Sequence, residues 1–485
     1  MFRTVGDQVS LWESLLPEEV LRLPAELARV DVLLDDPVFF APFARFFDPL
    51  IGRPSTLVEC YLRLMFLKFR YRLGYESLCQ EVADSISWRR FCRIPLDGRV
   101  PHPTTLMKLT SRCGEETVAG LNEVLWAKAA QAKLLRTARV RADTTVISAN
   151  VAYPTDVGLL AKAVGKLVRT ARRVQAAGGA TGTAMTDRRR AAARRAREMT
   201  AQMRARGKLA KDQSTAAIRR MSAGLADLAE KTAAEAAAVL RNGRRALPRA
   251  LSGRMRGRLR RALAELTVTI ERTGTIVAQA RTRLAGQTPQ GATRLVSLHD
   301  CDARPIRKGR IDRPVEFGYK AQVADNDEGI ILDYSVELGA APDGPQLAPA
   351  VNRIHQRAGR VPRAVAADRG YGQPAVERDL HELGVRTVAI PRQATTSAAR
   401  KTLEHSRGFR RLVKWRTGSE GRISYLKRSY GWDRTRLDGR QGAAIWCGHG
   451  VFAPGGISNP GRQSATEYLF GAVPEAMPND RDRRA

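Results

Sequence analysis

Residues 140–153, VRADTTVISANVAY, decide the fold class of this chain. β-Branched residues alternate with other side chains along the stretch, which is typical of a β-strand. Asp143 stands in the middle of this expected strand, although aspartate is depleted in strands. A carboxylate in such a place needs a paired cation or a ligand. The stretch therefore predicts a core strand that carries a functional acid.

More strands are expected after residue 290. RLVSLHD (294–300), EFGYKAQVAD (316–325) and GIILDYSVE (329–337) have strand patterns, and NDEG is a hairpin turn between the last two. Helices and strands then alternate: a helix at 346–359, a short strand within 363–372 that ends in Asp368 and a Gly-rich turn, a helix at 374–384, a strand at 386–392, a helix within 403–431 carrying Glu420, and a last helix from about 437 to 453. This order predicts a mixed α/β sheet.

The stretch between the first and second expected strands has a different composition. Residues 155–290 contain 30 Lys or Arg and 9 Asp or Glu, a net charge of +21. Alanine and arginine favour helices, and apolar residues recur every three to four positions, so long helices are expected, with turns at 178–182 and 242–249. We interpret this segment as an inserted helical arm, either a hairpin or a small bundle. The plainer alternative is a charged helix face that meets only water.

The first 130 residues have the apolar spacing of a compact helical domain, most clearly at 57–75. Three short helical patterns there cluster Arg89, Arg90 and Arg93, an arrangement similar to a DNA-binding helix-turn-helix. An all-helical packing domain with a solvated basic face is the alternative. The expected organisation is thus a helical, DNA-binding domain (1–130), a first core strand (131–154), a basic arm (155–290), the rest of the α/β core (291–453) and an irregular, disordered tail (454–485).

Composition narrows the classes of partner. The 485 residues include 82 Lys plus Arg and 49 Asp plus Glu, a formal net charge of +33, so nucleic acid is the first partner to expect and a membrane surface the second. No stretch reaches the roughly 18 apolar residues of a spanning helix, and the N-terminus lacks a signal-peptide pattern. We therefore expect a cytoplasmic protein without a membrane partner. Its separated cysteines are expected to be reduced and mostly buried: Cys60, Cys79, Cys92, Cys113, Cys301 and Cys447.

Three acids stand out by position. Asp143 lies in the first strand, Asp368 at the carboxyl end of a later one, and Glu420 on a late helix. Ligands of open α/β sheets collect at the carboxyl ends of strands, and two aspartates with a glutamate can hold two Mg²⁺ ions for in-line phosphoryl transfer. Arg416 and Lys427, four residues before and seven after Glu420, would share its helix face and hold phosphate oxygens. An ordinary salt-bridged helix surface is the alternative for this group.

Other acids compete for the role of metal ligand. Asp300, Asp302, Asp325 and Asp333 lie on or beside expected strands, but loop aspartates commonly cap turns. His299 and Cys301 are too isolated for a zinc site, and the basic run RPIRKGR (304–310) is expected to touch phosphates.

The motifs DTT at 143–145, ADRGYG at 367–372 and R-x3-E-x6-K at 416–427 resemble those of the DDE transposases of bacterial insertion sequences. The resemblance implies an RNase H-like core in which Asp143, Asp368 and Glu420 bind two Mg²⁺ ions, replaceable by Mn²⁺, while Arg416, Lys427 and Arg428 contact DNA. It also implies double-stranded DNA partners, namely terminal inverted repeats and target, and a homo-oligomer on DNA. One position departs from the signature, because Val413 stands where these transposases have tyrosine.

Two alternatives remain open on the sequence. One is a nuclease of the same fold that cuts without joining strands, and the other is an inactive DNA-binding relic. The second rests on the change after residue 453 to a Pro-, Gly- and polar-rich tail, which a shift of reading frame would explain.

Overall fold

The computed structural model describes residues 3–4, 16–48, 50–52, 54–133, 135–204, 211–249, 252–308, 314–393 and 397–453. The predicted tail at 454–485 lies outside this range. The chain splits into two compact units. The first comprises Met1–Ser148, Lys320–Glu337 and Ala341–Ala485, and the second comprises Ala149–Tyr319 and Leu338–Ala340.

Short helices form the beginning of the first unit. They are α2 (Glu18–Leu21), α3 (Ala25–Leu34), η1 (Pro37–Phe39), η2 (Ala41–Phe46), α4 (Val58–Arg70), α5 (Tyr75–Asp84), α6 (Ile86–Phe91) and α7 (Pro103–Gln131). Nearly every residue of α4 is buried, and both α4 and α7 pack against α17 (Gly439–Phe452). His102 caps α7 and Pro103 occupies its first turn, while Gly114, at φ +69°, kinks it. The helices expected for this part of the chain are present.

The mixed sheet expected from the sequence lies beside these helices. Within the first unit its strand order is β3–β1–β5–β6, with β4 paired to β3. The strands are β1 (Arg139–Ser148), β3 (Val315–Asp325), β4 (Ile331–Leu338), β5 (Ala364–Ala367) and β6 (Thr387–Ala389). β1 pairs in parallel with β5, and β5 with β6. Their alternating or continuous apolar runs are buried, as expected for strands covered by helices.

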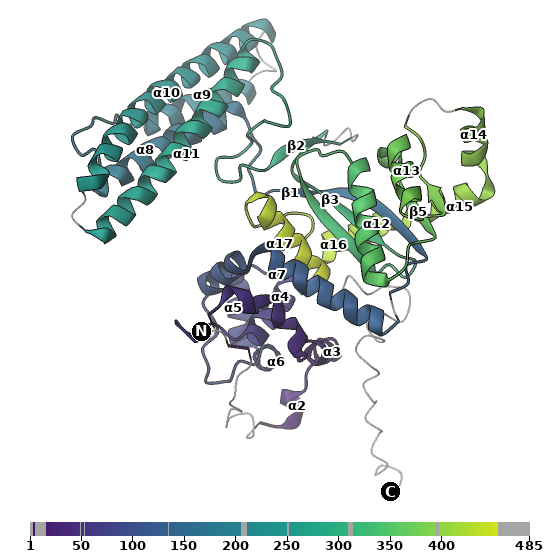
Figure 1. The fold of residues 1–485 in the computed structure, drawn as a ribbon. Coiled ribbons are helices and arrows are strands. Elements are labelled where there is room, and N and C mark those ends of the chain that lie inside the picture. Colours follow the sequence, from purple (N-terminus) through teal and green to yellow (C-terminus); the bar gives the residue numbers. More distant parts are fainter. Residues whose placement is uncertain are drawn as a thin grey trace, which may run out of the picture. The chain divides into compact units, whose positions relative to one another are not determined.

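Helices of the first unit flank the sheet (Figure 1). They are α12 (Gly344–Ala358), η5 (Arg369–Tyr371), α13 (Pro374–Glu382), α14 (Ala398–His405), α15 (Arg407–Arg416) and α16 (Gly418–Ser429). α15 packs on β5 and β6, and α16 packs on β1. Phe409 and Leu412 of α15 join Ala364, Ala366 and Ala389 of the strands in one apolar cluster.

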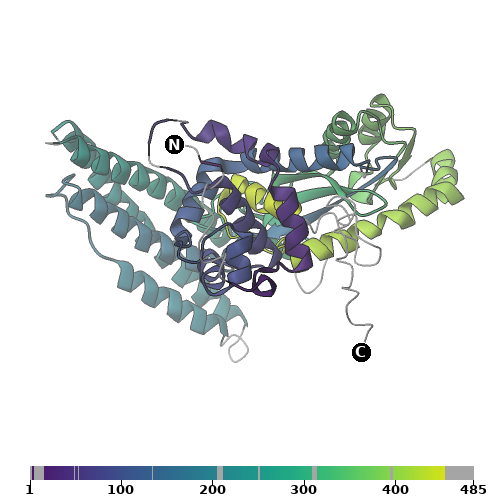
Figure 2. The ribbon, with the colours of Figure 1, turned by 90° about the horizontal axis from the view of Figure 1, so that it is seen from below.

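The second unit is a helical bundle followed by a short strand. Its helices are α8 (Asp156–Ala176), α9 (Arg189–Arg204), α10 (Lys211–Ala246), η4 (Leu247–Arg249) and α11 (Gly253–Leu284), and Figures 1 and 2 show the four long ones lying side by side. Apolar side chains of α8 at three- to four-residue spacing, such as Leu160, Val164 and Leu167, fill the interior of the bundle. The +21 segment therefore forms a bundle, one of the two arrangements expected for it.

Two local predictions were wrong. Residues 294–300 form no strand, because Leu295 and Leu298 pack on the bundle and Gln279 of α11 bonds both the N–H and the carbonyl of Leu295. The strand instead comes later, as β2 (Arg304–Arg307), which pairs antiparallel with residues 315–318. The helix expected within 403–431 is divided into α14, α15 and α16. Ser406 caps α15, and the helix is interrupted again at Thr417, between α15 and α16.

Candidate active site

Asp143 and Asp368 lie side by side at neighbouring strands. β1 and β5 are parallel, and their register pairs Ala142 with Ala367, the residues just before the two acids. Asp143 is 8% exposed, and its Oδ1 accepts a hydrogen bond of 2.8 Å from the Thr144 N–H. Asp368 caps the short η5 helix, accepting 2.8 Å from the Gly370 N–H. The sheet thus presents two carboxylates together where β5 ends.

Arg416 connects the third acid to this pair. Its guanidinium lies 3.0 Å from Asp143 Oδ2 and 3.1 Å from Glu420 Oε1. Arg416 is the last residue of α15, whereas Glu420 lies in the first turn of α16. The single helix expected for this group is divided at Thr417, and Arg416 and Glu420 remain in contact across the division.

Burial and neighbouring carboxylates both raise the pKa values of the two aspartates in this group. Burial raises the pKa of Asp143 to about 6; the Arg416 charge lowers this pKa, while the charges of Asp368 and Glu420 raise it. Burial also raises the pKa of Asp368, and the charge of Asp343 raises it further. The side chain of Glu420 is 65% exposed, so solvent reaches the group from its side. A cation placed among these acids would relieve their repulsion.

Asp343 is a member of the group that the sequence analysis missed. A Cβ added to Gly370 would lie 2.8 Å from Asp343 Oδ2 and 2.9 Å from Asp368 Oδ1, so both carboxylates face the same glycine. Lys320 of β3 lies 2.6 Å from Asp343 Oδ1. In the sequence, Asp343 looks like a helix cap before α12, but it makes no capping bond. Its role is visible only once β5 and α12 are placed.

A buried arginine fixes the α15–α16 junction to the strand that carries Asp143. Arg141 is bidentate on Asp325, at 3.0 Å from Nε to Oδ1 and 2.7 Å from Nη2 to Oδ2, and donates 2.9 Å to the Trp415 carbonyl. Ser419 donates 2.8 Å to Asp325 as well. A Cβ at Gly418 would clash with the Arg141 guanidinium. The network thus fixes Trp415, which precedes Arg416, and Ser419, which precedes Glu420.

The competing acids have structural partners. Asp325 belongs to the Arg141 network, Asp333 is paired with Arg353 and Arg357, and Asp300 accepts from the Tyr319 hydroxyl. Asp302, in the second unit, is partly exposed. His299 bonds Ser297 and the Asn150 carbonyl. Cys301 is partly exposed, and the other five free cysteines are buried. In the run at 304–310, Arg304–Arg307 form β2, and residues 309–310 lie outside the described part of the chain.

The predicted DNA contacts fall into two groups. Lys427 and Arg428 lie in the last turn of α16, where Arg428 is exposed. Arg89 instead donates to the carbonyls of Ala83, Pro95, Leu96 and Gly98, Arg90 donates to that of Leu21, and Arg93 pairs with Asp31 and Asp35. The three arginines of the N-terminal domain therefore hold its helices together. Val413, at the signature's tyrosine position, packs against the apolar cluster of α15.

The donor set suits hard divalent cations. Among the described residues, no group of three or more His, Cys, Asp or Glu side chains converges on one point in the arrangement of a formed metal site. Asp143, Asp368 and Glu420 nonetheless supply oxygen ligands of the kind that Mg²⁺ takes, and a pKa raised by burial and like charges marks where a cation would be favourable. In this structure the Arg416 guanidinium supplies the positive charge between the carboxylates of Asp143 and Glu420.

Comparisons with known proteins agree with this arrangement. Residues 14–112 match a family model described as "Transposase domain (DUF772)", and residues 300–453 match "Transposase DDE domain". The chain belongs to the insertion-sequence DDE transposases. It is thus a metal-dependent DNA transposase, and Asp368 and Glu420 lie in the second matched segment, while Asp143 lies between the two.

One curated relative is similar to part of this transposase. An uncharacterized protein, ORF8 in the nfe locus of Rhizobium meliloti, is 30% identical over 148 residues, covering 28% of this chain and 67% of that protein. No solved structure gives a significant match. Among the described residues, no helix is both long and apolar enough to cross a membrane.

Proposed function

We propose that this transposase binds the terminal inverted repeats of its mobile element, cleaves them to expose 3'-hydroxyls and joins those ends to target DNA. Catalysis is assigned to Asp143, Asp368 and Glu420 in an RNase H-like core. The observation that carries this assignment is the parallel register that pairs Ala142 with Ala367 and so sets Asp143 beside Asp368, with Glu420 tied to Asp143 through Arg416.

The three carboxylates would hold two Mg²⁺ ions, replaceable by Mn²⁺, which activate the attacking oxygen and stabilise the leaving oxygen. The protein's own part is to place the acids. The sheet register positions Asp143 and Asp368, and the Arg141 network positions the turn that carries Glu420. Once the carboxylates are neutralised, Arg416 is available to hold phosphate oxygens, together with Lys427 and Arg428.

The helical bundle is the proposed DNA grip. Arg254, Arg256, Arg258, Arg260 and Arg261 at the start of α11 are all exposed, and no acid within the described residues pairs with them. Arginines elsewhere in the bundle, such as Arg173, Arg188 and Arg281, are paired with acids. A row of unpaired cations attracts the DNA backbone. Pairing two DNA ends requires at least a dimer, so a homo-oligomer assembles on DNA in the bacterial cytoplasm.

Incubation of the full chain with Mg²⁺, DNA carrying the element's ends and a supercoiled target tests this proposal. Cleaved ends followed by strand-transfer products are expected from the wild type. Asp368→Asn should retain DNA binding and lose both products. Cleavage without joining would identify a nuclease of the same fold, and binding without cleavage by either protein would identify an inactive relic.

A further inference from the structure

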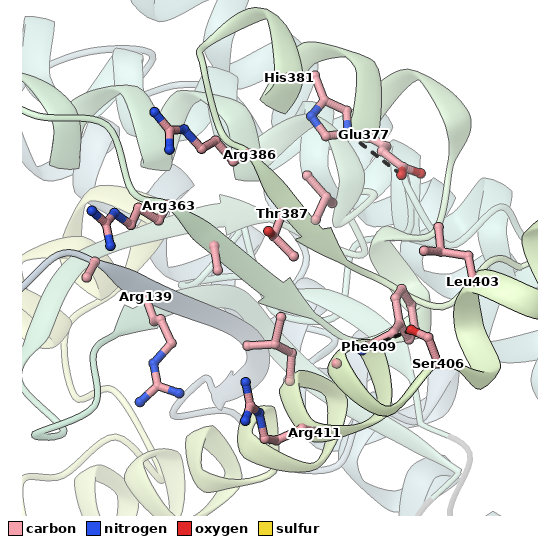
Figure 3. A pocket seen from close by; sticks show the side chains of 15 residues that line it. Arg139, Arg363, Glu377, His381, Arg386, Thr387, Leu403, Ser406, Phe409 and Arg411 are labelled. Carbon is pink, nitrogen blue, oxygen red and sulfur yellow. Dashed lines mark hydrogen bonds and ion pairs between the residues drawn. The ribbon is translucent and has the colours of Figure 1, made fainter.

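A cleft of about 880 Å³ opens at the edge of the sheet where three parallel strands begin. Arg139 is the first residue of β1, and Arg363 and Arg386 directly precede β5 and β6. Arg411 of α15 borders the cleft from the other wall, and Figure 3 shows these four arginines around it. The catalytic acids lie toward the opposite ends of the strands, because Asp143 is four residues, or about 13 Å, further along β1.

The charges around the cleft are unbalanced. Arg139 is paired with Asp327 at 2.8 Å, and the one acid of the lining, Glu377, is shared between Arg392 and Arg400. Arg363, Arg386 and Arg411 are exposed, and within the described part of the chain no acid pairs with their guanidinium groups. Three neighbouring cations without counter-ions repel one another unless an anion lies between them.

The floor of the cleft is apolar. Ala364 and Val388 of the strands and Phe409 and Leu412 of α15 form it, each between 6% and 9% exposed. Leu403 of α14 adds an apolar side chain that is 48% exposed. A cationic rim above an apolar floor suits a ligand with anionic groups along its outer side and apolar surface beneath them. A nucleic-acid strand has this character, with phosphates outside and sugars and bases inside.

We propose that this cleft binds the sugar–phosphate backbone of a DNA strand, at a place separate from the catalytic carboxylates. The inference rests on the proposed function, since it adds a second DNA contact to a DNA-cleaving enzyme. The three unpaired arginines hold phosphates, and Leu403 and Phe409 contact the sugars or bases. DNA is thereby held at both ends of the same strands, at the acids where β5 ends and at the arginines where it begins.

The test compares two triple variants of the full chain. In one, Arg363, Arg386 and Arg411 are changed to Gln, and in the other the same three residues are changed to Lys, which keeps the charge. Fluorescence anisotropy over a range of KCl concentrations gives the affinity for single- and double-stranded 20-mers. Each lost phosphate contact lowers the salt slope by about 0.7 to 0.9, so the Gln variant should lose about 2 to 3 from its slope, and the Lys variant should retain it.

Equal slopes and affinities for the wild type and the Gln variant, on both forms of DNA, would overturn the cleft proposal. A loss of slope on either form supports it. Cleavage of the element's ends by the wild type, measured with saturating protein, is a separate readout that tests the proposed function. If the wild type itself cuts nothing, the proposed function fails, while the slope comparison still decides on the cleft.

Discussion

Arg416 is the residue whose contacts say most about the active site. Its guanidinium contacts both buried Asp143 and exposed Glu420, where a bound cation would otherwise supply positive charge. The same side chain belongs to the R-x3-E-x6-K spacing that the sequence reveals. The sequence shows only the neighbours of Arg416 along its own helix. Its ion pair with Asp143 joins residues 273 positions apart, and only the structure reveals it.

Arg416→Gln should make the melting temperature of the protein more sensitive to Mg²⁺. Without its guanidinium, Asp143 stays buried beside Asp368 with no positive partner, a cost of about 1 to 3 kcal/mol. The melting temperature of the variant should be lower than that of the wild type in EDTA, and Mg²⁺ should raise it more than it raises the wild type's. Cleavage should fall about 10²- to 10³-fold. An identical Mg²⁺ effect on both melting temperatures would contradict this role.

At the scale of elements, the order of strands and helices could be predicted because it depends on local patterns. β1, β3, β4 and the helices after them follow alternation or helical spacing. The failed strand at 294–300 has strand-forming residues, but long-range packing on the bundle overrides that preference. The site shows the same division: Asp143, Asp368 and Glu420 stand in visible motifs, whereas Asp343 and Arg141 acquire their roles only through neighbours distant in sequence.

The Arg141–Asp325 pair should stabilise the α15–α16 junction. Asp325→Asn leaves a buried guanidinium without its counter-charge, so the free energy of unfolding should fall by about 3 to 5 kcal/mol. The double variant with Arg141→Met should recover part of this loss, because both charges are then absent. Urea unfolding of the single and double variants measures the coupling. Simple additivity of the two single effects would show that the pair does not act as a unit.

Lys68 should make the stability of the α4–α17 packing depend on pH. Burial, together with the nearby Arg436 charge, lowers its pKa to about 7. The unfolded chain holds this proton up to about pH 10.4, so the stability of the wild type should rise between pH 7 and pH 10. The rings of Phe69, Tyr75 and Trp446 around the ammonium offset part of the cost at pH 7.

The variant Lys68→Met removes this titration. It should be more stable than the wild type at pH 7, by about 1 to 3 kcal/mol, and this advantage should shrink toward pH 10. Denaturant unfolding at pH 7, 8.5 and 10 measures the difference. A constant difference at all three values would show that Lys68 does not lose its proton in the folded protein over this range.

At the scale of the whole molecule, most of the net positive charge lies in a different part of the sequence from the acids proposed to be catalytic. Residues 155–290 hold +21 of the formal +33, whereas the three acids proposed to be catalytic lie outside that segment. We therefore propose a division of labour, in which the bundle supplies much of the affinity for DNA and the α/β core supplies the reaction.

Changing the five exposed arginines at 254–261 to Gln tests that division. The salt slope of DNA binding should fall by about 4 to 5, because each phosphate contact contributes about 0.9. At protein concentrations that saturate the DNA, the cleavage rate should stay within about twofold of the wild type. Arg281→Gln, which removes an arginine already paired with Asp227 and Glu230, is the matched control and should leave the slope nearly unchanged. A fall of about 0.9 in the control, as large as that expected for each of the five exposed arginines, would contradict the assignment.

The most direct test of the central claim is Mg²⁺-dependent cleavage of DNA carrying the element's ends, measured side by side for Asp143→Asn, Asp368→Asn, Glu420→Gln and the control Glu382→Gln. Glu382 is an exposed acid on α13 outside the catalytic group. Each of the first three should abolish cleavage while DNA binding persists, and the control should cut like the wild type. Cleavage that survives in Asp143→Asn or Asp368→Asn would contradict the central claim.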